Sequence, residues 1–544
     1  GAIDDYNLAI KINPNLAQAY NNRGGVRSEL GDKPGAIDDY NLAIKFNPNY
    51  ADAYYNRGNV RDDLGDKQGA IDDYNLAIKI NPNLAQAYNN RGGVRSELGD
   101  KQGAIDDYNL AIKINPNLAQ AYNNRGGVRS ELGDKPGAID DYNLAIKFNP
   151  NFAEAYYNRG NVRNELGDKQ GAIDDYNLAI KFNPNFALAY YGRGVVRDDL
   201  GDKQGAIEDY NQAIKINPNY ALAYNNRGGV RNQLGDKQGA IEDYNQAIKI
   251  NPNYALAYNN RGGVRNQLGD KQGAIEDYNQ AIKINPNYAL AYNNRGGVRN
   301  QLGDKQGAID DYNLAIKFNP NLALAYNNRG YVRDDLGDKQ GAIEDYNLAI
   351  KFNPNFTEAY KNRGLIRYAL GNKQGAIDDF NQALKINPSN AYAYIDRGLI
   401  RSKLGDKQGA MEDYNQAIKI DPNLALAYYS RGVARSNLGD EQGAIEDFNQ
   451  ALKINPNYAN AYCDRGLTRY QLGDKQGAID DYNLAIKFNP NYVDAYIDRG
   501  LIRYALGNKQ GAIKDIQIAA NIYKKEGKET DYQDTMELIR KINK

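Results

Sequence analysis

Asparagine recurs at one fixed position of a 34-residue spacing through most of this chain. An amide side chain offers both donors and acceptors, so a row of them could clamp an extended peptide backbone without reading its side chains. Aspartate takes over the position near the carboxyl end, and Gly192 interrupts the row. The candidate peptide-binding residues are Asn22, Asn56, Asn90, Asn124, Asn158, Asn226, Asn260, Asn294, Asn328, Asn362, Asp396, Asp464 and Asp498.

The competing interpretation is a solvated polar face that gene duplication has multiplied. Residues 205–306 are three units identical letter for letter, so recurrence alone does not prove a site. Asn is a weak helix former, however, and the second glycine of pairs such as Gly24-Gly25 costs about 0.5–1 kcal/mol relative to Ala in a helix. A local rule broken repeatedly on one face favours binding.

Arginine and aspartate also recur in every unit, as Arg23, Arg27 and Asp39 do in the first complete one. The row could bind anions, or it could form an internal network between packed helices. Because a partner Asp accompanies each Arg pair, we expect the internal network. It should be at least half buried and bidentate, with the guanidinium stems over tyrosines.

Composition excludes several kinds of chemistry. Histidine is absent and Cys463 is the single cysteine, so no His/Cys metal site and no His-based catalysis is available. Carboxylates one repeat apart lie too far from each other to act as a pair. Basic and acidic residues balance at 68 each, which gives no basic excess for nucleic acid, and no apolar run is long enough to span a membrane. We therefore expect no enzyme activity, no catalytic residue, no metal and no cofactor, with a protein or peptide as the partner.

The elements that position these residues are pairs of helices. Apolar spacing predicts one helix over Ala17–Leu30 and a second over Gly35–Phe46. Asn15 is expected to cap the first helix and Gly31 to end it. Neither helix can bury its apolar stripe alone, so stacking of neighbouring units must supply the core.

This unit resembles a tetratricopeptide repeat, with Arg23 and Arg27 standing where that family has Leu and an aromatic residue. The matching residues are Tyr20, Gly24, Ala36, Tyr40 and Pro48. The resemblance implies an all-α, right-handed superhelical solenoid of 34-residue antiparallel helix pairs, with the first helices lining a concave groove. The asparagine row is similar to that of the tetratricopeptide superhelix in O-GlcNAc transferases, which hold substrate peptides in this way. No transferase catalytic domain is present in this sequence.

The repeat phase divides the chain into three parts. Residues 1–16 are an orphan second helix, 17–526 are fifteen repeats in one superhelix, and 527–544 are a capping helix. A capping box from Thr530 to Gln533 is expected to start that last helix. The chain opens inside a repeat, which indicates a truncated start, and the uncapped amino end offers a surface for self-association.

The leading hypothesis is a non-catalytic scaffold that binds an extended peptide or protein segment in the groove. One alternative is a structural, self-associating rod or filament. Another is the substrate-binding arm of an enzyme whose catalytic domain is absent here. The compartment stays open, with the cytoplasm favoured, because the sequence carries no signal or membrane-spanning segment.

Overall fold

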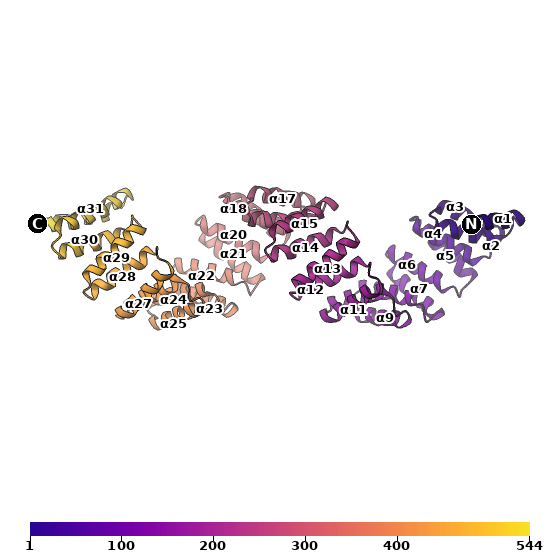
Figure 1. Cartoon of the computed structure of the whole chain (residues 1–544), viewed down its shortest axis with the longest axis horizontal. Helices are drawn as coiled ribbons and strands as arrows, with labels where there is room; N and C mark the ends of the chain where they lie inside the picture. Colours follow the sequence, from indigo (N-terminus) through magenta and orange to yellow (C-terminus); the bar gives the residue numbers. More distant parts are fainter. Residues whose placement is uncertain (544) are drawn as a thin grey trace. The chain divides into compact units, whose positions relative to one another are not determined.

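A computed structural model of the protein describes residues 1–543. Within this range the chain forms 32 α-helices and no strand, which confirms the predicted all-α fold of consecutive helix pairs (Figure 1). The first helices of the pairs carry even numbers and the second helices odd numbers. The helices are α1 (Ala2–Ile12), α2 (Ala17–Glu29), α3 (Lys33–Phe46), α4 (Ala51–Asp63), α5 (Lys67–Ile80), α6 (Ala85–Glu97), α7 (Lys101–Ile114), α8 (Ala119–Glu131), α9 (Lys135–Phe148), α10 (Ala153–Glu165), α11 (Lys169–Phe182), α12 (Ala187–Asp199), α13 (Lys203–Ile216), α14 (Ala221–Gln233), α15 (Lys237–Ile250), α16 (Ala255–Gln267), α17 (Lys271–Ile284), α18 (Ala289–Gln301), α19 (Lys305–Phe318), α20 (Ala323–Asp335), α21 (Lys339–Phe352), α22 (Thr357–Ala369), α23 (Lys373–Ile386), α24 (Ala391–Leu404), α25 (Lys407–Ile420), α26 (Ala425–Ser436), α27 (Glu441–Ile454), α28 (Ala459–Gln471), α29 (Lys475–Phe488), α30 (Val493–Ala505), α31 (Lys509–Lys525) and α32 (Glu529–Asn543).

The turn inside each pair is short because two residues fix it. Gly31 has φ of +87°, a left-handed conformation that favours glycine, and it ends the first helix as predicted. The carboxylate of Asp32 then accepts a hydrogen bond from the Gly35 backbone N–H at 3.0 Å and caps the second helix. The second helix therefore begins at Lys33, two residues before the predicted start.

The connection between repeats differs from the prediction. Helix α2 follows Leu16, whose side chain makes no capping hydrogen bond, so the expected cap by Asn15 is wrong. Instead, the Asn13 side-chain oxygen accepts from the Asn15 backbone N–H at 3.2 Å. This local Asx turn closes the loop and directs the chain into the next helix.

Close helix packing depends on alanine and glycine facing tyrosine. Ala36 and Ala43 are fully buried, and Tyr40 is 2% exposed. A Cβ added to Gly24 would lie 2.9 Å from Cε1 of Tyr40, so only glycine allows this approach. Within the same repeat, Tyr20 of α2 also stacks on Phe46 of α3, with ring centroids 5.5 Å apart.

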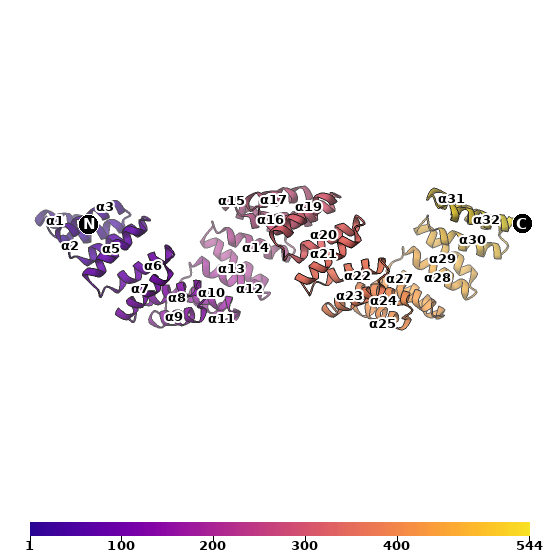
Figure 2. The ribbon, with the colours of Figure 1, turned by 180° about the vertical axis from the view of Figure 1, so that it is seen from behind.

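The helices group into two units, Gly1–Ile284 and Asn285–Lys544. Within each unit, a first helix contacts the second helix of its own repeat, the second helix of the preceding repeat and the neighbouring first helix (Figure 1; from behind in Figure 2). First helices such as α2 and α4 therefore lie side by side and share a surface.

The ends of the chain carry two different helices. Helix α1 contains no buried residue, and its Leu8 and Ile12 are 58% and 77% exposed. At the other end, Ile539 and Ile542 of α32 pack on Ile516 of α31. The predicted capping box is wrong, because α32 already begins at Glu529, whose carboxylate accepts from the Gln533 side chain at 2.7 Å.

Candidate functional site

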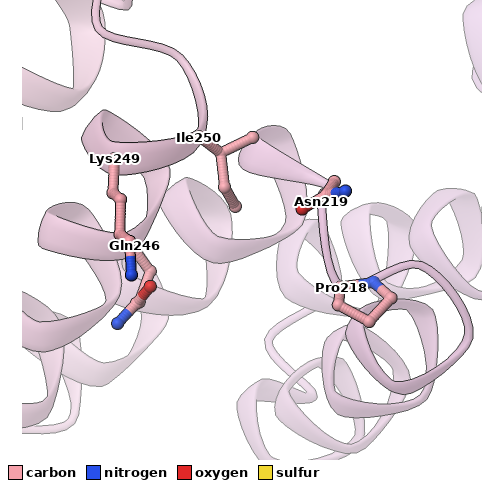
Figure 3. A pocket seen from close by; sticks show the side chains of 5 residues that line it. All are labelled: Pro218, Asn219, Gln246, Lys249 and Ile250. Atoms are coloured by element: carbon pink, nitrogen blue, oxygen red, sulfur yellow. The ribbon is translucent and has the colours of Figure 1, made fainter.

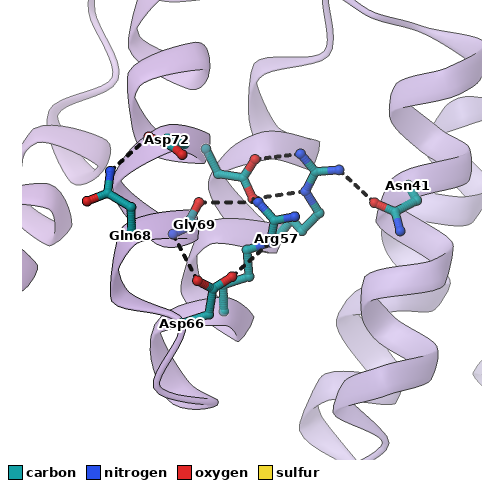
Figure 4. Close-up of polar contacts among 8 residues, drawn as sticks. Asn41, Arg57, Asp66, Gln68, Gly69 and Asp72 are labelled. Atoms are coloured by element: carbon teal, nitrogen blue, oxygen red, sulfur yellow. Dashed lines mark hydrogen bonds and ion pairs between the residues drawn. The ribbon is translucent and has the colours of Figure 1, made fainter.

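The arginine and aspartate rows form an internal network (Figure 4). Arg57 donates from Nε and Nη2 to the two carboxylate oxygens of Asp73, at 2.9 and 2.5 Å. Its Nη1 donates to the Asn41 side-chain oxygen on the preceding second helix at 2.6 Å. Arg61 donates to the same Asp73 at 3.0 Å and to the Gly69 carbonyl at 3.3 Å. One carboxylate thus joins two arginines, and one guanidinium joins three helices.

Burial shows that this network is structural. The Arg57 and Asp73 side chains are 13% and 1% exposed, and the guanidinium carbon of Arg57 lies 5.5 Å from the centre of the Tyr54 ring. The same bidentate pair recurs in all fifteen repeats, from Arg23–Asp39 to Arg499–Asp515. The prediction of a buried, bidentate network over tyrosines is confirmed, and this row does not present its charges to an anion.

We call the position of Asn22 in each repeat the rung, and the surface around it the first-helix face. In the first complete repeat this face includes the exposed Gln18 and Glu29 and the half-buried Asn22 and Gly25. All the predicted asparagine and aspartate rungs are half buried. The structure therefore places the whole predicted set at equivalent points of successive first helices.

Rung amides are linked between repeats by hydrogen bonds. Asn158 donates to Asn123 at 3.0 Å, and Asn123 donates to the rung Asn124 beside it at 3.4 Å. Asn124 in turn donates to Asn89 at 3.2 Å, and Asn89 donates to the rung Asn90 at 3.0 Å. The result is a continuous chain of side-chain amides running across α10, α8 and α6.

The same links recur elsewhere in both units. Tyrosine can replace the buried asparagine as acceptor, since Asn90 and Asn226 donate to the hydroxyls of Tyr55 and Tyr191 at 3.2 and 3.0 Å. The other asparagine links are Asn56 to Asn21, Asn260 to Asn225, Asn328 to Asn293 and Asn362 to Asn327. Each link in this chain of amides uses one N–H of one amide and one oxygen lone pair of the acceptor, and an amide has two of each.

Sequence reasoning missed the buried partner of each rung. Asn21 and its equivalents Asn89, Asn123 and Asn225 are less than a tenth exposed. The available signal was the Asn-Asn pair itself, because one residue of the pair faces the neighbouring helix whereas the other faces solvent.

Packing explains the break at Gly192. A Cβ there would lie 3.0 Å from Cζ of Tyr176. Tyr157 packs against Tyr176 and Phe186, with centroids 6.0 and 5.1 Å away. Glycine therefore makes room for an aromatic cluster at this rung.

The glycine beside the rung opens a notch above a tyrosine hydroxyl. The nearest atom to a Cβ added at Gly25 is the Tyr40 hydroxyl oxygen at 4.0 Å, so no packing contact requires glycine here. In the next repeat Asn59 occupies the same position, and its side-chain oxygen accepts from the Tyr74 hydroxyl at 2.8 Å. At the glycine positions no side chain lies over the hydroxyl, although the tyrosine itself is about as buried as Tyr74 below Asn59. The glycine notches are Gly25, Gly93, Gly127, Gly229, Gly263 and Gly297.

The aspartate rungs lie in partly desolvated surroundings. Tyr429 donates its hydroxyl to Asp464 at 2.8 Å, and Tyr482 donates to Asp498 at 3.3 Å. Burial raises the pKa of both carboxyls and of Asp396 above their usual range. These rungs therefore present acceptors whose charge is poorly compensated by solvent.

A pocket of about 520 Å³ lies away from the rungs, against α15 (Figure 3). Gln246, Lys249 and Ile250 of α15 and the loop residues Pro218 and Asn219 line it. It contains none of the predicted site residues. Among residues 1–543, no three His, Cys, Asp or Glu side chains are grouped to hold a metal ion. None of the described helices has the length and apolar character needed to cross a membrane.

Comparison with known proteins assigns the family. Models of the tetratricopeptide repeat together match well over half of the chain, and no curated protein matches it. One model described as "Tetratricopeptide repeat" matches residues 51–84, 85–118, 153–186, 187–220, 323–356 and 357–390. A "TPR repeat" model matches 26–65, 128–167, 228–269, 264–303, 400–439, 437–473 and 466–507, and a third model matches 289–322.

Three solved structures with a similar fold illustrate the range of sequence identity and coverage. A chain of the "APC/C hetero-tetramer Cut9-Hcn1" is 14% identical, with 85% of this chain and 96% of that chain covered and a TM-score of 0.45. MamA is 28% identical over 30% of this chain and 96% of its own, with a TM-score of 0.29. YrrB, described as a TPR protein with an unusual peptide-binding site, is 22% identical over 34% and 95%, with a TM-score of 0.30. The chain belongs to the tetratricopeptide repeat family, whose arrays are protein-interaction scaffolds.

Proposed function

We propose that this protein is a non-catalytic scaffold that holds an extended segment of another protein on its first-helix face. The observation that carries the proposal is the pairing of a rung amide with a glycine notch in the same helix. In the pair Asn124 and Gly127, for example, the amide lies beside the opening above the Tyr142 hydroxyl. Amide and hydroxyl groups are matched to the N–H and C=O groups of a peptide backbone.

The repeat spacing suits an extended chain. Packed helices lie about 8–10 Å apart, and an extended strand rises about 3.3 Å per residue, so roughly three ligand residues span one repeat. A ligand backbone would therefore meet equivalent polar groups at about every third residue. The glycine notch lets the backbone approach closely, because no side chain stands above the hydroxyl.

This mode of binding needs little from the ligand's side chains. The amide chain holds a rung such as Asn260 through one donor and one acceptor, because Asn260 donates to Asn225 at 3.2 Å and accepts from Asn259 at 3.3 Å. Fixed amides lose little side-chain entropy when a ligand binds, which favours binding by preorganisation.

The first test uses peptides selected from a random library of linear 12-residue peptides, with affinity measured by fluorescence anisotropy on the full chain. The test variant changes Asn226, Asn260 and Asn294 to Ala, and we expect at least a tenfold loss of affinity. The control variant removes three exposed amides from second helices of the same region. Its substitutions are Gln204→Ala, Gln238→Ala and Gln272→Ala. Equal affinity of test and control variants would remove the rungs from the proposal.

A second variant separates binding from folding, because loss of rung amides also breaks links between repeats. Gly229→Asn, Gly263→Asn and Gly297→Asn copy the residue that Asn59 and Asn161 already place at the notch, where it accepts from Tyr74 and Tyr176 at 2.8 Å. This variant should fold normally by circular dichroism and should bind the selected peptides at least tenfold more weakly. Unchanged binding would exclude the hydroxyl notches from the proposed binding site.

A further inference from the structure

In the second unit the notch position becomes apolar in five consecutive repeats. The row belongs to α22, α24, α26, α28 and α30 and consists of Leu365, Leu399, Val433, Leu467 and Leu501. Its four leucines are 40–46% exposed. A single exposed leucine needs no explanation, but leucines in register on one face of neighbouring helices indicate a contact surface.

Carboxylates accompany this row at the rung. Asp464 and Asp498 stand beside Leu467 and Leu501, one helical turn away on α28 and α30. The nearest arginines do not neutralise them, since Arg465 and Arg499 are committed to Asp481 and Asp515 through bidentate pairs. We call the surface formed by Asp396, Asp464, Asp498 and the five apolar residues the acidic–apolar face.

Two lysines, Lys361 on α22 and Lys403 on α24, lie on the helices that precede α28 and α30. The charge of Lys361 opposes the rise in the pKa of Asp396 that burial causes. Lys403 lines the pocket between α24 and α26 that is described next. On α28 and α30 the neighbouring exposed ionisable residue is Asp494, which adds a further negative charge. The region around Asp464 and Asp498 is therefore complementary to a cation.

A pocket opens within the apolar row between α24 and α26. It has a volume of about 190 Å³, and its walls include Leu399, Tyr414, Tyr429 and Val433. Ser430 forms part of the lining at the rung, where most repeats carry Asn. Small-molecule sites occupy about 300–1,000 Å³, so this pocket suits one large apolar side chain.

We propose that the acidic–apolar face binds an extended partner segment that carries one large apolar side chain together with lysine or arginine residues. The apolar side chain fills the pocket at Ser430, and the cations pair with Asp464 and Asp498. This inference rests on the proposed binding of an extended chain. The pocket lies between α24 and α26, about one and a half repeats before Asp464 and about two and a half before Asp498. At about three residues per repeat, the two cations lie about four and about seven residues from the apolar anchor.

The burial of the two aspartates strengthens such a pair. Tyr429 holds Asp464 in place through its hydroxyl at 2.8 Å, so the carboxylate is already oriented. A charge pair in partly desolvated surroundings is stronger than one in bulk water, provided that the cation keeps its hydrogen bonds. Apolar ligand residues between the cations would cover Leu467 and Leu501.

The probe is a fluorescein-labelled 14-residue peptide with one Phe, Lys at the fourth and seventh positions after it, and Leu and Ser elsewhere. A second probe has the reversed sequence, because the face does not define chain direction. Matched probes replace both Lys by Glu, or Phe by Ser. We expect at least tenfold tighter binding of the Lys–Phe probe than of either matched probe in one orientation, and a loss of the Lys preference as salt rises.

Two variants locate the interaction. Asp464→Asn with Asp498→Asn should abolish the preference for Lys over Glu, and Ser430→Asn, which restores the residue found at other rungs, should abolish the preference for Phe over Ser. The matched control, Glu446→Gln with Asp480→Asn, removes two exposed carboxylates from second helices and should change neither preference.

The outcomes separate this inference from the proposed function. Equal binding of Lys and Glu probes, with binding weakened by the notch variants, would overturn the acidic–apolar face and leave the scaffold intact. A Lys preference that survives Asp464→Asn with Asp498→Asn would also overturn it. If neither these probes nor any library peptide binds, the proposed function itself fails.

Discussion

Removal of one buried aspartate tests whether the arginine network holds the repeats together. Asp413 in α25 accepts from Nε and Nη2 of Arg397, at 3.0 and 2.5 Å, and from Arg401 at 3.1 Å. Asp413→Ala leaves both guanidinium groups without this acceptor. Arg397 keeps its hydrogen bond to Asn381 on the preceding second helix, at 2.7 Å, and its contact with the Tyr394 ring, whose centre lies 5.3 Å from the guanidinium carbon.

The expected loss follows from burial. The Arg397 and Asp413 side chains are 14% and 3% exposed, and removing one member of a buried pair costs about 3–5 kcal/mol. Arg401 is 23% exposed, so water can replace part of its contact, which places the loss near about 3 kcal/mol. A local opening equilibrium should therefore increase roughly a hundredfold.

Hydrogen exchange measured by mass spectrometry suits this prediction, because repeat arrays lose stability locally and need not unfold as one unit. Met411 distinguishes α25 from every other second helix, so its peptides can be assigned. Glu412→Ala, at the exposed neighbour, is the control, and Asp413→Asn should fall between wild type and Asp413→Ala. A change below about 1 kcal/mol, or an equal effect of Glu412→Ala, would refute a structural role for the network.

Three further outcomes are expected. Gly228→Ala should lower the free energy of local opening by about 1–3 kcal/mol, because its Cβ would lie 3.0 Å from Tyr244. Gly229→Ala should raise it by about 0.5–1 kcal/mol, and hydrogen exchange compares the two variants. Asn123→Ala should cost about 1–2 kcal/mol in the same assay, because it removes two links of the amide chain. Burial raises the pKa of Asp464, so the charged carboxylate destabilises the fold above that pKa, and the penalty disappears as pH falls through it. Asp464→Asn should therefore be more stable than wild type near about pH 7, and the difference should shrink toward about pH 4; a constant difference would contradict this reasoning.

Patterns that depend on helical periodicity could be predicted from the sequence. The helix pair and the close contact of Gly24 with Tyr40 follow from apolar spacing and from small residues facing large ones. The buried Arg57–Asp73 pair was predictable too, because both charges fall on packing faces and recur together. The residues that cap the helices were harder to predict from the sequence. Asn15 and Asp32 can both cap a helix, and only the backbone conformation decides which one does.

Interactions between repeats could not be derived in the same way. The link from Asn124 to Asn89 depends on how two first helices are rotated against each other, which no single repeat encodes. The position of Tyr40 in the repeat does not reveal that its hydroxyl oxygen lies 4.0 Å from a Cβ placed at Gly25. Comparing Gly25 with Asn59, which covers the equivalent hydroxyl, was the available signal.

If the proposed binding mode holds, the amide chain lets one array combine general and selective binding. Where the amide chain is continuous, as from Asn158 to Asn90, each rung donates an N–H to the preceding repeat, so successive rungs share this orientation toward a ligand. Identical presentation cannot select among sequences, but several weak contacts on one scaffold add through effective concentration. Selection among ligand sequences needs a rung of a different kind. Ser430, which lines the pocket, is such a rung, and Asp464 follows it in the next repeat. A ligand that carries the apolar and basic anchors should therefore bind at Ser430 and Asp464. The rest of its backbone can then extend along neighbouring rungs, where no particular sequence is required.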